Sequence, residues 1–235
     1  MEKLYSSIED NLKLIMFQIN ESREKYGRQN DDVRLMAVTK TIPPKAVNEA
    51  IALGVNLIGE NKAQELSSKY ESYDKNDVEI HFIGHLQRNK VKQVIDKVSV
   101  IQSVDSLKLA EEIDTQAQKS GIKMDILAEV NIGGEISKSG VLPHKLEPLL
   151  KEISKMHCIC VKGLMAIPPF CDDMKQTEKY FSAMQELFID IKGKNIDNVS
   201  MDVLSMGMSG DYKEAIKYGA NIIRIGAAIF GQRNN

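Results

Sequence analysis

A lysine follows a short apolar run in the first part of this chain. Lys40 comes directly after Arg34-Leu-Met-Ala-Val-Thr, a run that is too short for a helix and typical of a buried strand. Thr-Ile-Pro-Pro then ends the strand, because proline donates no ladder hydrogen bond and restricts the residue before it. Burial at a strand end lowers the pKa of a lysine and leaves a neutral amine that can attack a carbonyl carbon. The position favours Schiff-base chemistry; a lysine that extends its head into solvent is the alternative.

Two segments near the other end have the residue types of an anion site. They are Leu204-Ser-Met-Gly-Met-Ser-Gly-Asp211 and Ile223-Arg-Ile-Gly-Ala-Ala-Ile-Phe-Gly231. Glycines allow close backbone approach, helix starts present N–H groups, Ser209 adds a hydroxyl and Arg224 a permanent charge. These features predict a phosphate site, with Ser209 as a plain N-cap and Gly226 as a packing glycine as the alternative reading.

Apolar periodicity indicates the elements that position these residues. From Leu4 to Ile19 apolar residues recur every three or four positions, which predicts a leading amphipathic helix that closes near Gly27. Pro148 either starts a helix after a short turn at Pro143 or kinks it. Short apolar strands alternate with helical patterns, and the eight candidates are residues 33–38, 56–59, 79–84, 98–103, 124–131, 158–167, 200–204 and 221–225.

Eight strand–helix units after a leading helix favour a single α/β domain, a parallel (β/α)8 TIM barrel over residues 1–235, with residues 1–27 packing on it. An open doubly wound sheet is the runner-up, but no Gly-x-Gly-x-x-Gly follows the first strand. In a closed barrel the first and eighth strands are neighbours, about 4.8 Å apart. Lys40 and the phosphate segments then meet at the mouth formed by the carboxyl ends of the strands. Pyridoxal 5′-phosphate (PLP) requires such a pairing of an amine with a phosphate cradle.

Composition excludes several classes of function. Apolar residues make up 43% and charged residues 27%, and a net charge of −2 gives no electrostatic reason to bind nucleic acid or membrane. Neither a signal-peptide pattern nor an apolar run of ~18 residues is present, and three cysteines argue against a disulfide framework. We expect a cytoplasmic monomer.

Other charged and metal-like patterns receive ordinary interpretations. The alternating charges of residues 60–75 are expected on a solvated helix face. His81 and His85 have the spacing of a zinc helix, but Phe-Ile-Gly between them is typical of strand and turn, so we expect core or rim histidines. Cys158 and Cys160 are expected to be buried thiols, and no metal site is predicted.

Specific motifs run through most of the chain from Leu35 onwards. The chain resembles the pyridoxal phosphate homeostasis proteins, the PROSC-type PLP-binding family. The motifs that carry the resemblance are Ala-Val-Thr-Lys40-Thr-Ile-Pro, Ile58-Gly-Glu-Asn61, His81-Phe-Ile-Gly-His-Leu-Gln87-Arg-Asn89-Lys90, Glu129-Val-Asn131, Ser137-Lys138-Ser-Gly140, Gly163-Leu-Met165-Ala-Ile-Pro-Pro169, residues 205–211 and residues 224–231.

The resemblance implies a barrel similar to the N-terminal domain of alanine racemase. It implies Lys40 as the residue that holds PLP as an aldimine, with Ser209, Arg224 and Gly226 near the phosphate. Asn61 also matches a family motif and is expected to face the mouth, as are Gln87, Asn89 and Lys138. Many relatives have a threonine directly after the glycine that corresponds to Gly226. This chain has Ala227 there, so one side-chain donor to the phosphate is expected to be missing.

The expected function is PLP binding in cofactor homeostasis, as a carrier or regulator of PLP supply and amino-acid balance, with PLP-dependent apo-enzymes as partners. We expect no robust catalysis, because a racemase needs bases on both faces of the cofactor. Alanine racemases take one base from a second domain, and Asn235 ends this chain nine residues after Gly226. A slow amino-acid racemase or lyase stays open as an alternative. So does a PLP-independent aldolase in which Lys40 reacts with a sugar phosphate.

Overall fold

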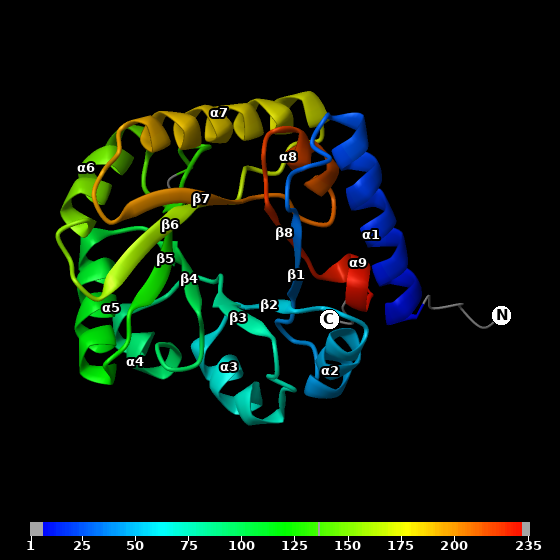
Figure 1. The fold of residues 1–235 in the computed structure, drawn as a ribbon, viewed down its shortest axis with the longest axis horizontal. Helices are drawn as coiled ribbons and strands as arrows, with labels where there is room; N and C mark the ends of the chain where they lie inside the picture. The colour runs from blue at the N-terminus through cyan, green and yellow to red at the C-terminus, as the bar shows by residue number, and fades with distance from the viewer. Residues whose placement is uncertain (1–6, 136, 232–235) are drawn as a thin grey trace.

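The structure is a computed structural model that describes residues 7–135 and 137–231. Eight parallel strands close into a barrel in chain order, surrounded by helices (Figure 1). The expected TIM barrel is therefore confirmed, and each predicted strand overlaps an observed one with bounds that differ by at most two residues. The strands are β1 (Arg34–Val38), β2 (Leu57–Glu60), β3 (Glu79–Phe82), β4 (Val100–Val104), β5 (Met124–Val130), β6 (Ile159–Ala166), β7 (Val199–Ser205) and β8 (Ile222–Ile225).

Prolines mark the first residue of two helices in the layer around the barrel. Pro44 begins α2, where its fixed φ suits the first turn. Pro148 lies inside α6, which begins at Pro143, so it does not start that helix. The helices are α1 (Ile8–Lys25), α2 (Pro44–Ala52), α3 (Ala63–Lys69), α4 (Val91–Val94), α5 (Leu107–Ser120), α6 (Pro143–Ile153), α7 (Met174–Gly193), α8 (Tyr212–Lys217) and α9 (Ala227–Phe230), with 3-10 turns η1 (Tyr70–Ser72) and η2 (Arg88–Lys90).

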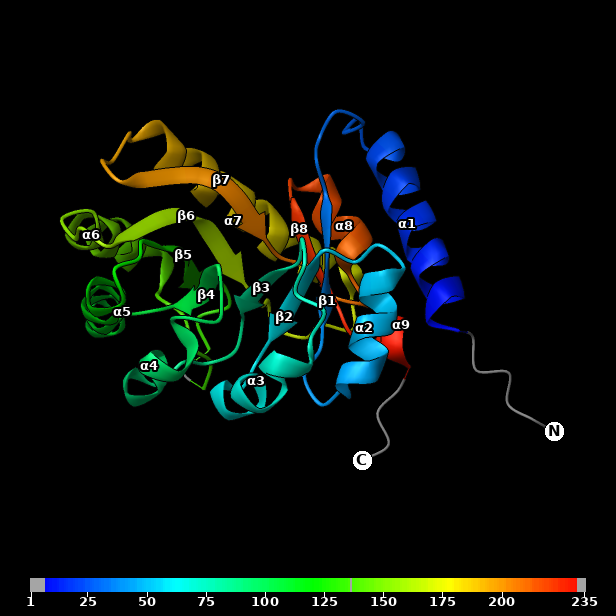
Figure 2. The same ribbon diagram turned by 60° about the horizontal axis from the view of Figure 1, so that its bottom comes forward.

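The extra helix α1 packs beside α8 and α9 on the outside of the β8–β1 side of the barrel (Figures 1 and 2). The Ser7 side chain caps it, and the buried stripe of Leu12, Ile15 and Ile19 faces the barrel. Leu4, the first residue of the predicted apolar stripe, lies outside the described residues. Asn11 Nδ2 donates to the Ile229 carbonyl of α9 at 2.8 Å, so α1 holds one of the two short helices that follow the last strands.

Side chains alternate between two cores, because successive strand residues point to opposite faces. Outward-facing side chains pack under the helices in one large cluster. A smaller apolar cluster fills the lumen of the barrel, formed by Met36, Val38, Leu57, Ile83 and Ile222. Polar side chains also enter the lumen, among them His81 of β3, Gln102 of β4 and Arg224 of β8.

Barrel closure brings the two ends of the chain together. β1 pairs with β8 in register, with Met36 opposite Arg224 and Ala37 opposite Ile225. The prediction that the first and eighth strands are neighbours is confirmed. Within the described residues, no helix is both long and apolar enough to cross a bilayer.

Candidate functional site

Lys40 lies two residues beyond the end of β1, at the mouth of the barrel, and is half-buried. The Thr39 N–H continues the β1–β2 ladder by donating to the Gly59 carbonyl at 3.0 Å. Thr41 has a φ of 66°, a left-handed conformation that β-branched residues rarely adopt. Lys40 therefore lies where a regular strand changes into a constrained turn, and such backbone outliers cluster at functional sites.

A buried carboxyl group holds the backbone just before Lys40. Glu60 has no exposed surface, and its Oε1 atom accepts hydrogen bonds from Thr39 Oγ1 at 2.7 Å and from the Tyr73 hydroxyl at 2.5 Å. Burial and the Glu60 carboxyl together raise the pKa of Tyr73, so its hydroxyl stays protonated and donates. Glu60 Oε2 is buried without a hydrogen-bond partner among the described residues. This group thereby ties the end of β1 to β2 and η1.

A second carboxyl group holds the backbone just after the lysine. Glu65 accepts a hydrogen bond from the Thr41 N–H and pairs with the Lys69 ammonium. Lys69 also donates to the Thr39 carbonyl at 3.2 Å. The expectation that residues 60–75 form a solvated face is wrong here, because Lys69 and Glu65 are mostly buried in ion pairs against the β1 loop. The charge alternation in the sequence could not reveal this packing.

The loop after β7 is shaped by a glycine and an aspartate. Gly207 has a φ of 89°, and a Cβ there would lie 2.6 Å from the Ala215 Cβ atom, so only glycine fits. Asp211 Oδ1 accepts a hydrogen bond from the Met208 N–H at 2.6 Å, which closes the turn around Ser209. Ser209 is exposed at this turn. The expectation that its hydroxyl holds a phosphate stays a prediction.

The start of α9 lies beside β1. A Cβ on Gly226 would be 3.3 Å from the Val38 carbonyl oxygen, so the backbones approach closely at this point. The first N–H groups of a helix have no intrahelical acceptor, and in α9 the helical bonds begin with Ile229, which donates to the Gly226 carbonyl. The amides of Ala227 and Ala228 precede that bond. These backbone N–H donors therefore lie next to β1, the strand that leads to Lys40.

Arg224 is a buried cation inside the barrel. Only 4% of the residue is exposed, and its guanidinium donates to Ser205 Oγ at 2.7 Å and to the Ala166 carbonyl at 2.8 Å. Burial lowers its pKa to about 10, while Asp211 and Glu129 oppose the change, so it stays charged at neutral pH. The side chain reaches the ends of β7 and β6. The expectation that it adjoins a phosphate stays a prediction.

Sequence reasoning missed Glu129, a carboxyl group at the mouth. Its neighbours on β5 pack outward in the helical layer, so alternation directs Glu129 into the lumen. The residue is 7% exposed, and burial raises its pKa to about 7; the nearby Asp105 adds to the rise and Arg224 opposes it. A carboxyl within the apolar run Ile-Leu-Ala-Glu-Val was the available signal. The mouth therefore has a group that exchanges a proton near neutral pH.

Asn61 follows β2 and has an unsatisfied acceptor. Its Oδ1 atom is buried without a hydrogen-bond partner among the described residues. Gly84, after β3, packs on its backbone, because a Cβ there would lie 2.1 Å from the Asn61 carbonyl oxygen. Buried polar atoms are nearly always paired in proteins, so an unpaired one indicates a place for a ligand or water.

The remaining polar residues of the family motifs are Gln87, Asn89 and Lys138. Gln87 precedes η2 and Asn89 lies within it. Both residues line a pocket together with Glu112 of α5. Because η2 follows the carboxyl end of β3, the expectation that they face the mouth stays a prediction. Lys138 pairs with Glu135 at 2.7 Å and lies 3.5 Å from the Pro168 carbonyl, so it bridges the loops after β5 and β6.

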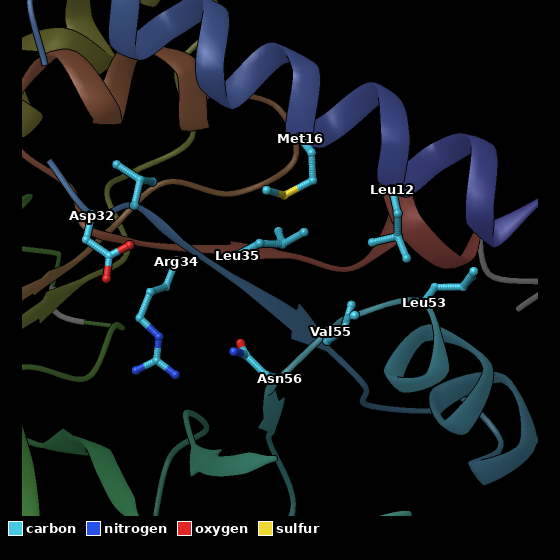
Figure 3. Close-up of a pocket in the computed structure, with 10 residues that line it drawn as sticks. Leu12, Met16, Asp32, Arg34, Leu35, Leu53, Val55 and Asn56 are labelled. Atoms are coloured by element: carbon cyan, nitrogen blue, oxygen red, sulfur yellow. The ribbon is translucent and has the colours of Figure 1, made fainter. Parts of the chain in front are cut away.

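A separate pocket of about 400 Å³ opens at the amino ends of β1 and β2. Figure 3 shows Leu12 and Met16 of α1 and Leu53 after α2 along one side of β1, with Arg34 pointing away from that apolar wall. Lys40 follows the opposite, carboxyl end of β1. This pocket is therefore not part of the mouth.

The mouth combines a lysine amine, backbone amides, a buried guanidinium and a carboxyl group that titrates near neutral pH. An amine can bond a carbonyl carbon, and amides together with a hydroxyl bind an anion. The arrangement suits a small anionic carbonyl compound that spans the β8–β1 side of the barrel.

Comparisons with known proteins agree on one family. The sequence pattern described as alanine racemase, N-terminal domain, matches residues 11–234. A pyridoxal phosphate homeostasis protein of Aquifex aeolicus is 40% identical over 95% of this chain and 97% of its own length. Another of that name, from Haemophilus influenzae, is 37% identical over 97% of both chains.

Solved structures extend the comparison. PipY of Synechococcus elongatus with PLP bound is 30% identical, with a TM-score of 0.83, and the match covers 96% of this chain and 100% of PipY. An alanine racemase from Clostridium difficile has a TM-score of 0.70 at 16% identity, and the match covers 96% of this chain and 58% of the racemase. At that identity the racemase shares the fold alone.

Proposed function

The chain belongs to the pyridoxal phosphate homeostasis protein family, and from that premise we propose that it binds PLP at the mouth of its barrel. Its role is intracellular PLP homeostasis, as a carrier or regulator of cofactor supply. PLP-dependent apo-enzymes are the proposed recipients. PipY, whose structure contains PLP, supports the choice of ligand.

One observation carries the proposal: the close approach of Gly226 to Val38. The Cβ position of Gly226 lies 3.3 Å from the Val38 carbonyl oxygen, and Val38 is two residues before Lys40. This approach supports a site that combines the donors at the start of α9 with the lysine amine. A ligand with an aldehyde at one end and a phosphate at the other matches that pairing.

The residues present fit the cofactor. When bound, PLP supplies an aldehyde that condenses with an amine and an electron-withdrawing ring. Lys40 provides the amine, while the Ser209 hydroxyl and the amides from Gly226 onwards hold the phosphate. Asn61 Oδ1, a buried acceptor without a partner in the described residues, takes a donor of the ligand. Ala227, whose side chain has no donor, offers its backbone N–H.

The carrier role is favoured over catalysis by the openness of the mouth. Ser209 and its neighbour Met208 are both exposed, so water reaches a ligand held there. Water weakens the electrostatic stabilisation that a carbanion needs. A single domain over residues 1–235, a monomeric state and a cytoplasmic location stay predictions.

Trapping with borohydride tests the role of Lys40. Purified chain is mixed with PLP and reduced, and its intact mass is measured. We expect one pyridoxyl-phosphate adduct per chain, lost in Lys40→Arg, which keeps the charge but lacks the reactive amine. Lys45→Arg, an exposed lysine on α2, is the matched control and should keep the adduct. An adduct of equal yield on Lys40→Arg contradicts the assignment.

The same experiment separates the two alternatives. An aldolase would trap a sugar phosphate rather than PLP, and the two adducts differ in mass. A racemase or lyase would change amino acids in the PLP-loaded chain, which chiral chromatography detects. Sustained turnover that depends on Lys40 would replace the carrier role by an enzymatic one.

A further inference from the structure

A chain of hydrogen bonds crosses the lumen below the mouth. Arg224 donates to Ser205 Oγ at 2.7 Å, Ser205 donates to Gln102 Oε1 at 2.7 Å, and Gln102 Nε2 lies 2.8 Å from His81 Nδ1. His81 Nε2 lies 3.2 Å from Glu79 Oε2. The first four residues are at least nine-tenths buried. Four strands, β8, β7, β4 and β3, therefore contribute to a single buried network.

The network ends at the opposite side of the barrel from the mouth. Glu79 begins β3 and pairs with Arg34 at 2.8 Å. Arg34 begins β1 and lines the pocket at the amino ends of the strands (Figure 3). The hydrogen bonds thus connect Arg224, at the candidate cofactor site, with a partly exposed ion pair at the far end.

Chemistry determines the direction of each bond. A guanidinium only donates, so Ser205 Oγ accepts from Arg224 and has one proton to give to Gln102. The amide nitrogen of Gln102 also only donates, so His81 Nδ1 must accept. A neutral imidazole that accepts at Nδ1 has its proton on Nε2, which then donates to Glu79.

The reversed arrangement leaves two groups unsatisfied. With the Gln102 amide turned over, Ser205 would accept from both neighbours, and its own proton would lack an acceptor within this network. His81 would then donate from Nδ1 and turn the lone pair of Nε2 towards the Glu79 carboxylate. Buried polar groups without partners are costly, so only one direction satisfies every member.

From this network we propose that Ser205, Gln102 and His81 are positioning residues that aim the Arg224 guanidinium towards the cofactor, and that the Nε2–H tautomer of His81 fixes the direction of the whole chain. The inference rests on the proposed binding of PLP. It also gives a role to the histidine of the His-Phe-Ile-Gly motif, which the sequence predicted only as a core or rim residue.

The surroundings of His81 favour the neutral ring. It is 2% exposed, and burial lowers its pKa, while Glu79 raises it. Arg34 on β1 also lowers the pKa and Asp125 on β5 raises it, so charges on three strands face the ring. The network needs a ring with one proton, and this environment supplies one at neutral pH.

Nitrogen NMR of the histidine side chains tests the direction without any cofactor. The chain has four histidines, and His81→Gln identifies the signal of His81. We expect Nδ1 unprotonated and Nε2 protonated in the PLP-free protein. Gln102→Glu replaces the donor beside Nδ1 by an acceptor, so both nitrogens should then be protonated at neutral pH. A protonated Nδ1 in the wild-type chain overturns the proposal.

PLP titration tests the positioning. Gln102→Leu breaks the network at its centre, and we expect its dissociation constant for PLP to rise about tenfold, as for the loss of a hydrogen bond to a charged group. The absorbance maximum of bound PLP should move as well, because a displaced guanidinium changes the field at the ring. If Gln102→Leu does not fold, Ser205→Ala makes the same measurement.

Asn198→Gly is the matched control for lost stability. Asn198 donates from Nδ2 to the Met156 and Ile159 carbonyls, away from the network, and its φ of 58° suits glycine. It should bind PLP with wild-type affinity and the wild-type spectrum. Wild-type affinity and spectrum in the folded network variant overturn the positioning role. If the wild-type chain itself gains no PLP adduct, the proposed function fails, whereas the NMR result still decides the network.

Discussion

The Glu129 carboxyl group makes a quantitative test of the mouth's electrostatics. Burial raises its pKa from 4.5 to about 7, with the carboxylate of Asp105 adding to the rise. The native state therefore binds a proton between pH 4.5 and 7 that the unfolded chain has released. It follows that the contribution of this group to stability is greatest below pH 4.5 and falls as the pH rises to about 7.

The magnitude follows from the same rise. Because one pKa unit corresponds to about 1.4 kcal/mol, ionised Glu129 costs the native state about 3 kcal/mol above pH 7. Glu129→Gln removes the charge and keeps the shape. The unfolding free energy of the variant minus that of the wild-type chain should therefore rise by up to about 3 kcal/mol from pH 4.5 to pH 8.

Urea unfolding of the PLP-free chain measures this gain. The chain has no tryptophan, so circular dichroism is the suitable signal. Val130→Ala, a neighbour on β5 without a titratable group, is the control and should lose the same free energy at both pH values. If the difference between Glu129→Gln and the wild-type chain is equal at pH 4.5 and pH 8, the electrostatic account of the mouth is wrong.

Three further predictions concern the elements that support the site. Tyr73→Phe removes a donor to the buried Glu60 carboxyl and should cost about 1–3 kcal/mol in urea unfolding; a smaller loss would mean that water replaces the hydroxyl. Gly226→Val brings side-chain atoms against Val38 and should weaken PLP binding about tenfold, with a smaller loss for pyridoxal, which has no phosphate. Equal losses of affinity for both ligands in fluorescence titration would show that Gly226 does not contact the phosphate. Asn11→Leu removes the bond from α1 to α9 and should cost about 1 kcal/mol in unfolding free energy, together with a lower PLP affinity; unchanged affinity would show that α1 does not position α9.

Several features of the fold could be predicted from the sequence because they depend on local pattern. Apolar runs bounded by proline and glycine located all eight strands, since a strand buried on both faces needs a continuous apolar run. Barrel closure then placed the end of β1 near Gly226, because a closed parallel barrel pairs its first strand with its last. The glycines of the two C-terminal segments were informative for the same local reason: Gly207 adopts a conformation that a side chain would forbid.

Features that depend on side-chain packing between distant segments could not be predicted. Glu60 and Lys69 belong to a charge pattern that is typical of a solvated helix, yet they are buried against Thr39 because α3 folds back onto β1. The partners of the buried Arg224 guanidinium, Ser205 and the Ala166 carbonyl, come from two other strands and left no signal in the sequence.

By itself, the sequence determined the order of strands and helices, the closed barrel and the strand end that holds Lys40, since backbone periodicity and the steric limits of proline and glycine act over a few residues. Only the tertiary structure decided which polar groups are buried together. His81 and Ser205 are joined through Gln102 across the lumen, and Glu129 titrates near neutral pH because several strands together exclude water from it. Burial and hydrogen-bond partners are properties of the assembled barrel, because desolvation depends on every element that surrounds a group.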